Sequence, residues 1–189
     1  MPAIIPLGEL TQADKQAIRN AAKEAGINKA VEGKIASREN LVARDMVLGN
    51  GAVANFADIT NVTAAVALQE QWLWDAVDLV ADNLTNVCGT TAVPDSKVFV
   101  FFGFTDLSAS PELTAIRFRR GSDDVDFWEV EQCYAYQNEV GGMIKGAILF
   151  EQNDPIQIQF NVSGGLVDLR IPLLAYVIER YGERISKAI

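Results

Sequence analysis

The chain has 189 residues, of which 49% are hydrophobic, and this is enough apolar material for one domain with a core of its own. Its formal net charge is −9. An acidic balance disfavours nucleic acid as a partner, because phosphate binding needs a basic surface. The sequence contains no histidine, which excludes Ser-His and Cys-His nucleophile systems and histidine-dependent metal sites.

The first predicted element is a helix that begins after Thr11, with Asp14 at the capping-box position, and covers residues 12–25. Gly26 suits the position that follows a helix, and residues 28–35 are a candidate second short helix. The apolar face of the first helix is thin and rich in alanine. A helix of this length is marginal alone in water, so it must dock on another surface.

Composition changes near Ser37, which predicts a helical arm over residues 1–36 and a β domain over residues 37–189. The arm either folds back on its own β domain or docks on a neighbouring subunit. The thin helix face and the extended, proline-flanked lead favour the neighbour. The residues expected to make this assembly contact are Ile4, Ile5, Leu7 and Ile18.

The next third of the chain is harder to interpret. Alternation predicts a strand over residues 37–48, and the stretch 62–84 fits two structures. Leu73, Val77, Val80 and Leu84 recur at helical spacing, which favours a helix. A strand over residues 71–77 is the alternative, because two tryptophans stand two residues apart there. Residues 84–93 are taken as a lead into a turn at residues 94–96.

The second half of the chain is a series of strands separated by turn residues. Period-2 alternation or dense apolar runs predict strands over residues 98–104, 113–119, 126–136, 142–150, 156–162 and 166–178. Pro172 falls inside the last range, so that strand lies at a sheet edge or carries a bulge. This series indicates a mainly β protein, an antiparallel β-sandwich or barrel, preceded by the helical arm.

Two cysteines, Cys88 and Cys133, are expected to be reduced thiols and not a disulfide. The N-terminus lacks the features of a signal peptide, and no stretch is long and apolar enough to span a membrane. The chain is therefore expected to be made in a reducing cytoplasm, with no membrane partner.

An acidic cluster of Asp123, Asp124 and Asp126 follows Gly121 and offers hard oxygen ligands of the kind that calcium prefers. The alternative is a solvated hairpin tip, since aspartate and glycine suit turns. The spacing lacks the glutamate and glycine of an EF-hand loop, so the hairpin tip is favoured. No metal site and no cofactor are predicted.

Charged and aromatic side chains near this cluster allow further interpretations. Arg117 and Arg119 share one strand face and are expected to pair with Glu129 and Glu131 of a neighbouring strand, in preference to meeting a carboxylate of a neighbouring subunit or binding an anion. If Glu129 and Glu131 lie on one strand face, about 6–7 Å apart, they also form a candidate carboxylate pair for a hydrolase. Core packing is favoured over a sugar platform for the aromatic residues Trp72, Trp74, Phe127, Trp128, Tyr134 and Tyr136.

The β half also resembles a known class of proteins. The resemblance rests on four segments, Val-Pro-Asp-Ser-Lys-Val-Phe-Val-Phe-Phe-Gly at 93–103, Pro-Glu-Leu-Thr-Ala-Ile-Arg-Phe at 111–118, Glu-Val-Glu at 129–131 and Pro-Ile-Gln-Ile-Gln-Phe at 155–160. They resemble the β-sandwich, jelly-roll-type structural proteins of tailed-phage particles, over about residues 90–180. The shared features are strand and turn patterns without catalytic content.

This resemblance implies a non-enzymatic viral structural protein that forms part of a capsid, a decoration layer or a tail. Its partners would be copies of itself and other virion proteins, and its location the virion, after synthesis in the host cytoplasm. The second expectation is a carbohydrate-binding or receptor-binding β-sandwich module. The third is a hydrolase that uses carboxylates.

Overall fold

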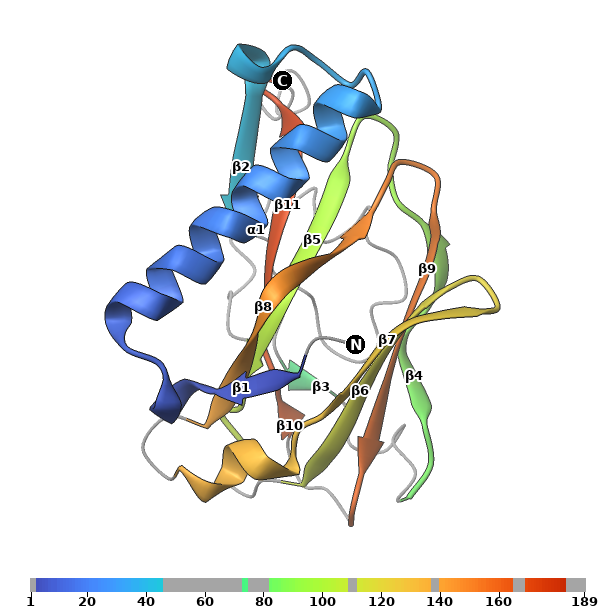
Figure 1. Cartoon of the computed structure of the whole chain (residues 1–189). Coiled ribbons are helices and arrows are strands. Elements are labelled where there is room, and N and C mark those ends of the chain that lie inside the picture. Colours follow the sequence, from blue (N-terminus) through green and yellow to red (C-terminus); the bar gives the residue numbers. More distant parts are fainter. Residues whose placement is uncertain are drawn as a thin grey trace.

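A computed structural model of the chain describes residues 3–45, 73–74, 82–108, 112–136, 140–164 and 169–182. These residues form a mainly β structure with antiparallel sheets and one N-terminal α-helix (Figure 1). The helix is α1 (Gln12–Glu32), and the short 3-10 helices are η1 (Leu7–Glu9), η2 (Arg38–Asn40) and η5 (Glu131–Ala135). The strands are β1 (Ile4–Pro6), β2 (Leu41–Asp45), β3 (Leu73–Trp74), β4 (Thr85–Ala92), β5 (Val98–Thr105), β6 (Leu113–Arg120), β7 (Asp123–Glu129), β8 (Gly141–Phe150), β9 (Pro155–Val162), β10 (Leu169–Arg170) and β11 (Leu173–Arg180). Within the described ranges, no helix has the length and apolar character needed to cross a membrane.

Nine of the strands form two antiparallel sheets. The five-stranded sheet has the order β1-β8-β5-β11-β2, and the four-stranded sheet has the order β4-β9-β6-β7. The pairing is nested in sequence: β2 pairs with β11, β4 with β9, β5 with β8, and β6 with β7. Successive nested pairs belong alternately to the five-stranded and the four-stranded sheet.

A core of aliphatic and aromatic side chains joins the two sheets. The ring of Phe101 on β5 lies 5.2 Å from that of Phe118 on β6, and Phe118 lies 4.7 Å from Trp128 on β7, measured between centroids. The buried Trp128 indole donates a hydrogen bond to Asp126 Oδ2 at 3.0 Å, so its polar group is satisfied. The inward faces of both sheets are therefore covered.

Helix α1 lies across the outer face of the five-stranded sheet (Figure 1). Its start is as expected, because the Thr11 amide donates to Asp14 Oδ2 at 3.0 Å and the Asp14 amide donates to Thr11 Oγ1 at 3.1 Å. The predicted end at Gly26 is wrong, since one helix continues to Glu32. At Gly26 a Cβ atom would lie 2.5 Å from Val100 Cγ2, so glycine there lets the helix approach the sheet closely.

The arm folds back on its own sheet, in contrast to the expected docking on a neighbour. Ile4 of β1 pairs with Ile144 of β8, and Ile4, Leu7 and Ile18 are buried within this chain while Ile5 is half-buried. Docking on a neighbour was expected because the apolar face of the helix is thin, without regard to the side chains that the sheet supplies. Small residues on that face permit close contact, and the sheet supplies the large side chains of the shared core.

Most predicted strands are confirmed, with differences in their bounds and two omissions. The strand predicted over 37–48 is β2, which follows η2, and residues 46–48 lie outside the described ranges. The strand predicted over 126–136 ends at Glu129 and is followed by η5, and β1 and β4 were missed. The strand predicted over 166–178 contains β10 and all of β11 except its last two residues, with Pro172 between the two strands. Of the ambiguous stretch 62–84, Leu73–Trp74 forms β3, as in the strand alternative at those two residues. Residues 62–72 and 75–81 lie outside the described ranges.

Cys133 is a free, fully buried thiol. Burial is the main cause that raises the pKa of Cys133 to about 12, and the negative charge of Glu9 is the second cause. Thiolate is the reactive form, so the native thiol is protected both by burial and by protonation. The side chain of Cys88 lies outside the described residues.

We expect Cys133 to resist alkylation by iodoacetamide in the native protein at pH 8 and to react fully after unfolding in urea. Peptide mapping of the modified protein measures this at Cys133 alone. Rapid native labelling at this position would contradict the buried placement.

Candidate functional site

The outer face of the four-stranded sheet gathers the polar side chains that the sequence placed on alternate strand positions. On β6 and β9 one set of alternate residues fills the core and the other lies on the opposite, outer face of the sheet, where Gln157 and Gln159 are each 9% exposed. We call the outward set the polar face. Its charged members are Arg117, Arg119, Asp124 and Glu129, and Asn86, Phe127, Gln157 and Gln159 lie in the same layer.

One row of the polar face connects all four strands by hydrogen bonds. Arg117 donates from Nε to Asp124 Oδ1 at 2.9 Å and from Nη2 to Asp124 Oδ2 at 2.5 Å. Arg117 Nη1 also lies 3.5 Å from Gln159 Oε1, and Gln159 Nε2 donates to Asn86 Oδ1 at 2.9 Å. The row fixes the planar groups of these side chains in one layer on the sheet.

A second row is centred on Arg119. Its guanidinium donates to Gln157 Oε1 at 3.2 Å and to the Ser122 carbonyl at 2.6 Å, and its Nε lies 3.2 Å from Asp124 Oδ1. The hydrogen bond from Arg117, together with the charges of both arginines, lowers the pKa of Asp124. Two guanidinium groups thus share one carboxylate.

The expected partners of the arginines, Glu129 and Glu131, are not the ones used. A register shift between Phe118 and Arg119 brings Asp124 opposite Arg119, whereas Glu129 stands opposite Ala115. Glu131 belongs to η5, since β7 ends at Glu129. The two glutamates therefore do not share a strand face, which removes the geometric basis of the hydrolase interpretation.

The three aspartates of the predicted acidic cluster have separate surroundings. Asp124 pairs with the arginines, while Asp126 is buried and accepts hydrogen bonds from Trp128 Nε1 and the Phe127 amide. Asp123 is exposed beside the hairpin turn, opposite Arg120 in register. In the part of the chain that the structure describes, no three His, Cys, Asp or Glu residues are grouped to hold a metal ion.

The aromatic residues considered as a sugar platform are also dispersed. Trp128 is in the core, Tyr134 packs against the core, and the Tyr136 hydroxyl donates to Glu9 Oε1 at 2.8 Å. Phe127 is half-buried on the polar face, opposite Arg117. The side chains of Trp72 and Trp74 lie outside the described residues.

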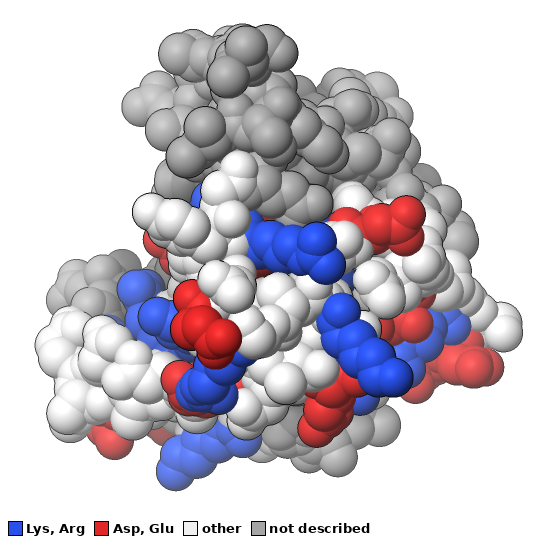
Figure 2. Space-filling model, turned by 90° about the horizontal axis from the view of Figure 1, so that it is seen from above, with Lys and Arg blue, Asp and Glu red and all other residues white. Residues whose placement is uncertain are grey.

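The polar face is less acidic than the chain as a whole. Its two arginines are balanced by two acidic residues, Asp124 and the outward Glu129, so the face carries no net charge, on a chain whose formal net charge is −9. Arg117 and Arg119 remain about one quarter exposed. At the end of the molecule seen in Figure 2, by contrast, basic and acidic side chains are interspersed. The polar face is thus suited to contact planar polar or acidic groups.

Sequence reasoning missed Asn86, Gln157 and Gln159 as members of this face. The alternation of Gln157, Gln159 and Asn161 with apolar residues marked the outward positions of β9, and it was the available signal. Nothing in the sequence joins these side chains to Arg117, because that contact depends on which strands are neighbours.

A buried ion cluster was also missed. Glu179 on β11 is 3% exposed and accepts from Lys97 Nζ at 2.6 Å and from Arg44 Nε at 2.8 Å. Burial by itself raises the pKa of Glu179, but the hydrogen bonds and charges of Arg44 and Lys97 outweigh it, so the pKa is lowered. This cluster ties β2 to β11 and to the residue that precedes β5, which is a structural role.

Comparison of the chain with protein-family models, with curated proteins and with solved structures found no match.

Proposed function

We propose that the chain is a non-enzymatic structural protein of a virus particle, with the jelly-roll form of the β-sandwich. One observation carries the proposal: the strand pairs are nested, and successive pairs alternate between the two sheets. Such an order results when a long antiparallel ribbon winds into two facing sheets, which is the construction of a jelly roll.

Jelly rolls occur in viral capsid proteins, in lectins and in cupins. The lack of histidine disfavours a cupin, whose metal site depends on that residue. The strand and turn pattern of residues 90–180 favours a virion protein over a lectin. We therefore place the chain among capsid, decoration or tail components that bind copies of themselves or other virion proteins.

The proposed assembly surface is the polar face, since the arm is occupied on its own sheet. The face is a layer of hydrogen-bonded side chains with balanced charge, and its arginines remain about one quarter exposed, so they can meet acidic groups of other copies of this chain. Phe127 supplies an apolar group in the same layer.

We expect the full-length chain to form an oligomer of fixed copy number in sedimentation velocity and native mass spectrometry, and to be present in virus particles purified from the cells that make it. Phe127→Glu is expected to weaken oligomerisation at least tenfold, because it places a charge in the assembly layer. Tyr181→Glu is the matched control, since this aromatic residue is 79% exposed elsewhere.

Circular dichroism of both variants checks that each is folded. A protein that stays monomeric across the micromolar range and is missing from purified particles would refute the structural role. Equal effects of the two variants would refute the choice of surface.

A carbohydrate-binding or receptor-binding module is the second candidate, and the amide and guanidinium groups beside Phe127 favour it. In that case a glycan array detects saturable binding by the wild-type chain that is lost in Gln159→Ala. The virion proposal predicts no glycan binding that depends on Gln159.

A further inference from the structure

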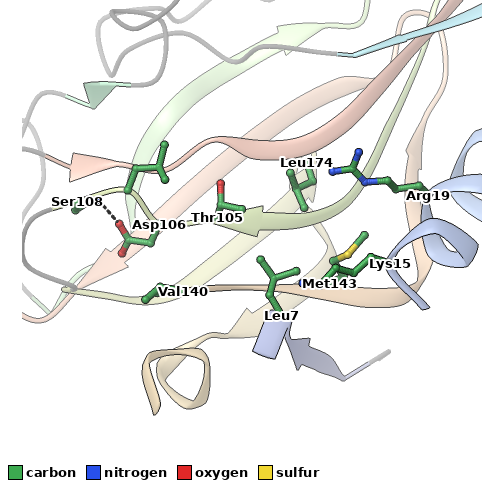
Figure 3. A pocket seen from close by; sticks show the side chains of 10 residues that line it. Leu7, Lys15, Arg19, Thr105, Asp106, Ser108, Val140, Met143 and Leu174 are labelled. Carbon is green, nitrogen blue, oxygen red and sulfur yellow. Dashed lines mark hydrogen bonds between the residues drawn. The ribbon is translucent and has the colours of Figure 1, made fainter. Parts of the chain in front are cut away.

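A pocket of about 480 Å³ lies where the start of α1 meets β5, β8 and β11 (Figure 3). Sites for small molecules in proteins have volumes of roughly 300–1,000 Å³, so this pocket is of a suitable size. It is separate from the polar face, which belongs to the other sheet.

The floor of the pocket is apolar. Leu7 of η1 and Met143 of β8 are buried, and Leu174 of β11 is half-buried beside them. In Figure 3 these side chains lie between the charged residues of the two ends. Three elements that are distant in sequence contribute one residue each, so the floor is formed by the folded chain as a whole.

One end of the pocket carries a carboxylate held in place. Asp106 is 8% exposed, and its Oδ1 accepts from the Ser108 amide at 2.8 Å while its Oδ2 accepts from the Tyr134 hydroxyl at 2.7 Å. The Asp106 amide donates to the Val140 carbonyl at 3.0 Å, which fixes the backbone as well. Each carboxylate oxygen retains the capacity to accept a further hydrogen bond.

The other end carries two cations from α1. Lys15 and Arg19 are one helical turn apart on one face of the helix, and both line the pocket. Arg19 reaches from the helix over Leu174 (Figure 3). Within the described residues it forms no ion pair with Asp106 or any other carboxylate, so its guanidinium is available for a bidentate contact.

We propose that this pocket binds a small zwitterion whose carboxylate and ammonium groups are separated by a short apolar chain. The carboxylate pairs with Arg19 at the helix end, the ammonium group donates to Asp106, and the apolar chain lies on Leu7, Met143 and Leu174. The proposal does not depend on the virion role, since the pocket belongs to a single chain.

The probe is 6-aminohexanoate, titrated into the ¹⁵N-labelled full-length chain and followed by two-dimensional NMR. We expect saturable shifts that are confined to the first turns of α1 and to residues 105–108, with a dissociation constant of about 1 mM or lower. Hexanoate lacks the ammonium group and hexylamine lacks the carboxylate. Each is expected to bind at least fivefold more weakly.

Arg19→Gln is expected to weaken binding of 6-aminohexanoate about tenfold, through loss of the charged pair. Lys23→Gln is the matched control, because it removes one charge from the same helix at an exposed position one turn beyond the pocket, and it should change affinity less than twofold. The Asp106 end is tested through the ligands alone, since Asp106 also holds Tyr134 and Ser108.

Three results would overturn the proposal. The first is the lack of any saturable shift with 6-aminohexanoate. The second is equal binding of hexanoate, which would assign the pocket to simple amphiphilic anions. The third is an equal effect of Arg19→Gln and Lys23→Gln. None of these results bears on oligomerisation through the polar face, so failure of this proposal is distinguishable from failure of the proposed function.

Discussion

Removal of residues 1–36 is expected to abolish the cooperative thermal unfolding transition of the chain. Helix α1 covers Val100, Phe102 and Ile178 on the outer face of the five-stranded sheet, and all three are at most 2% exposed. Burial of one large apolar side chain contributes roughly 1.5–3 kcal/mol. Exposure of this whole layer therefore approaches the total stability of about 5–15 kcal/mol that is typical of a domain.

A matched pair of point variants separates loss of this contact from the effect of truncation. Ala22 is fully buried against the sheet, whereas Ala21 beside it is exposed. We expect Ala22→Arg to lose the cooperative transition in differential scanning calorimetry and Ala21→Arg to retain it. A truncated chain that unfolds cooperatively near the wild-type temperature would restore the interpretation of an autonomous β domain with a separable arm.

Replacement of Glu179 by glutamine is expected to lower the free energy of unfolding by about 3–5 kcal/mol at pH 7. The change leaves Lys97, whose side chain is 8% exposed, without its buried counter-charge. Urea denaturation followed by fluorescence measures the difference. Glu129→Gln, at an exposed position, is the control and should change the free energy by less than about 0.5 kcal/mol. Equal stability of the two variants would show that the ion cluster of Glu179 contributes nothing to the free energy of unfolding.

The same cluster predicts a pH dependence. The folded protein lowers the pKa of Glu179 from its usual value of 4.5. A carboxyl of this kind contributes its full stability above the unfolded pKa and loses it as the pH falls through the folded pKa. The stability difference between wild type and Glu179→Gln should therefore be constant above about pH 5.5 and shrink as the pH falls below 4.5.

The parts of the fold that sequence predicted are those fixed by local pattern. The capping box of Thr11 and Asp14 is a contact within one turn, and β9 alternates apolar with polar residues, of which the apolar ones fill the core between the sheets. The end of the helix was predicted wrongly because Gly26 does not end the helix but permits its close packing against Val100, a residue distant in sequence. Strand β4 was missed because its segment is short of large apolar residues, and its pairing with β9 makes it a strand.

The polar face was only half predictable for a similar reason. The outward position of Arg117 and Arg119 follows from alternation on one strand. Their partner does not, because a register shift beside Arg119 selects Asp124 over the glutamates. The pairing of Arg44 with Glu179 spans 135 positions and depends on the full topology.

The nested strand pairing also constrains how the chain emerges from the ribosome. Strand β5, which is buried along nearly its whole length, pairs only with β8 and β11, and both are synthesised after it. Strand β2 likewise pairs with β11, close to the end of the chain. A nascent chain must therefore carry its most apolar strand unpaired until β8 has been made, and β2 unpaired until β11, the last of the described strands, has been made. During that interval the unpaired strands are open to aggregation with other nascent copies.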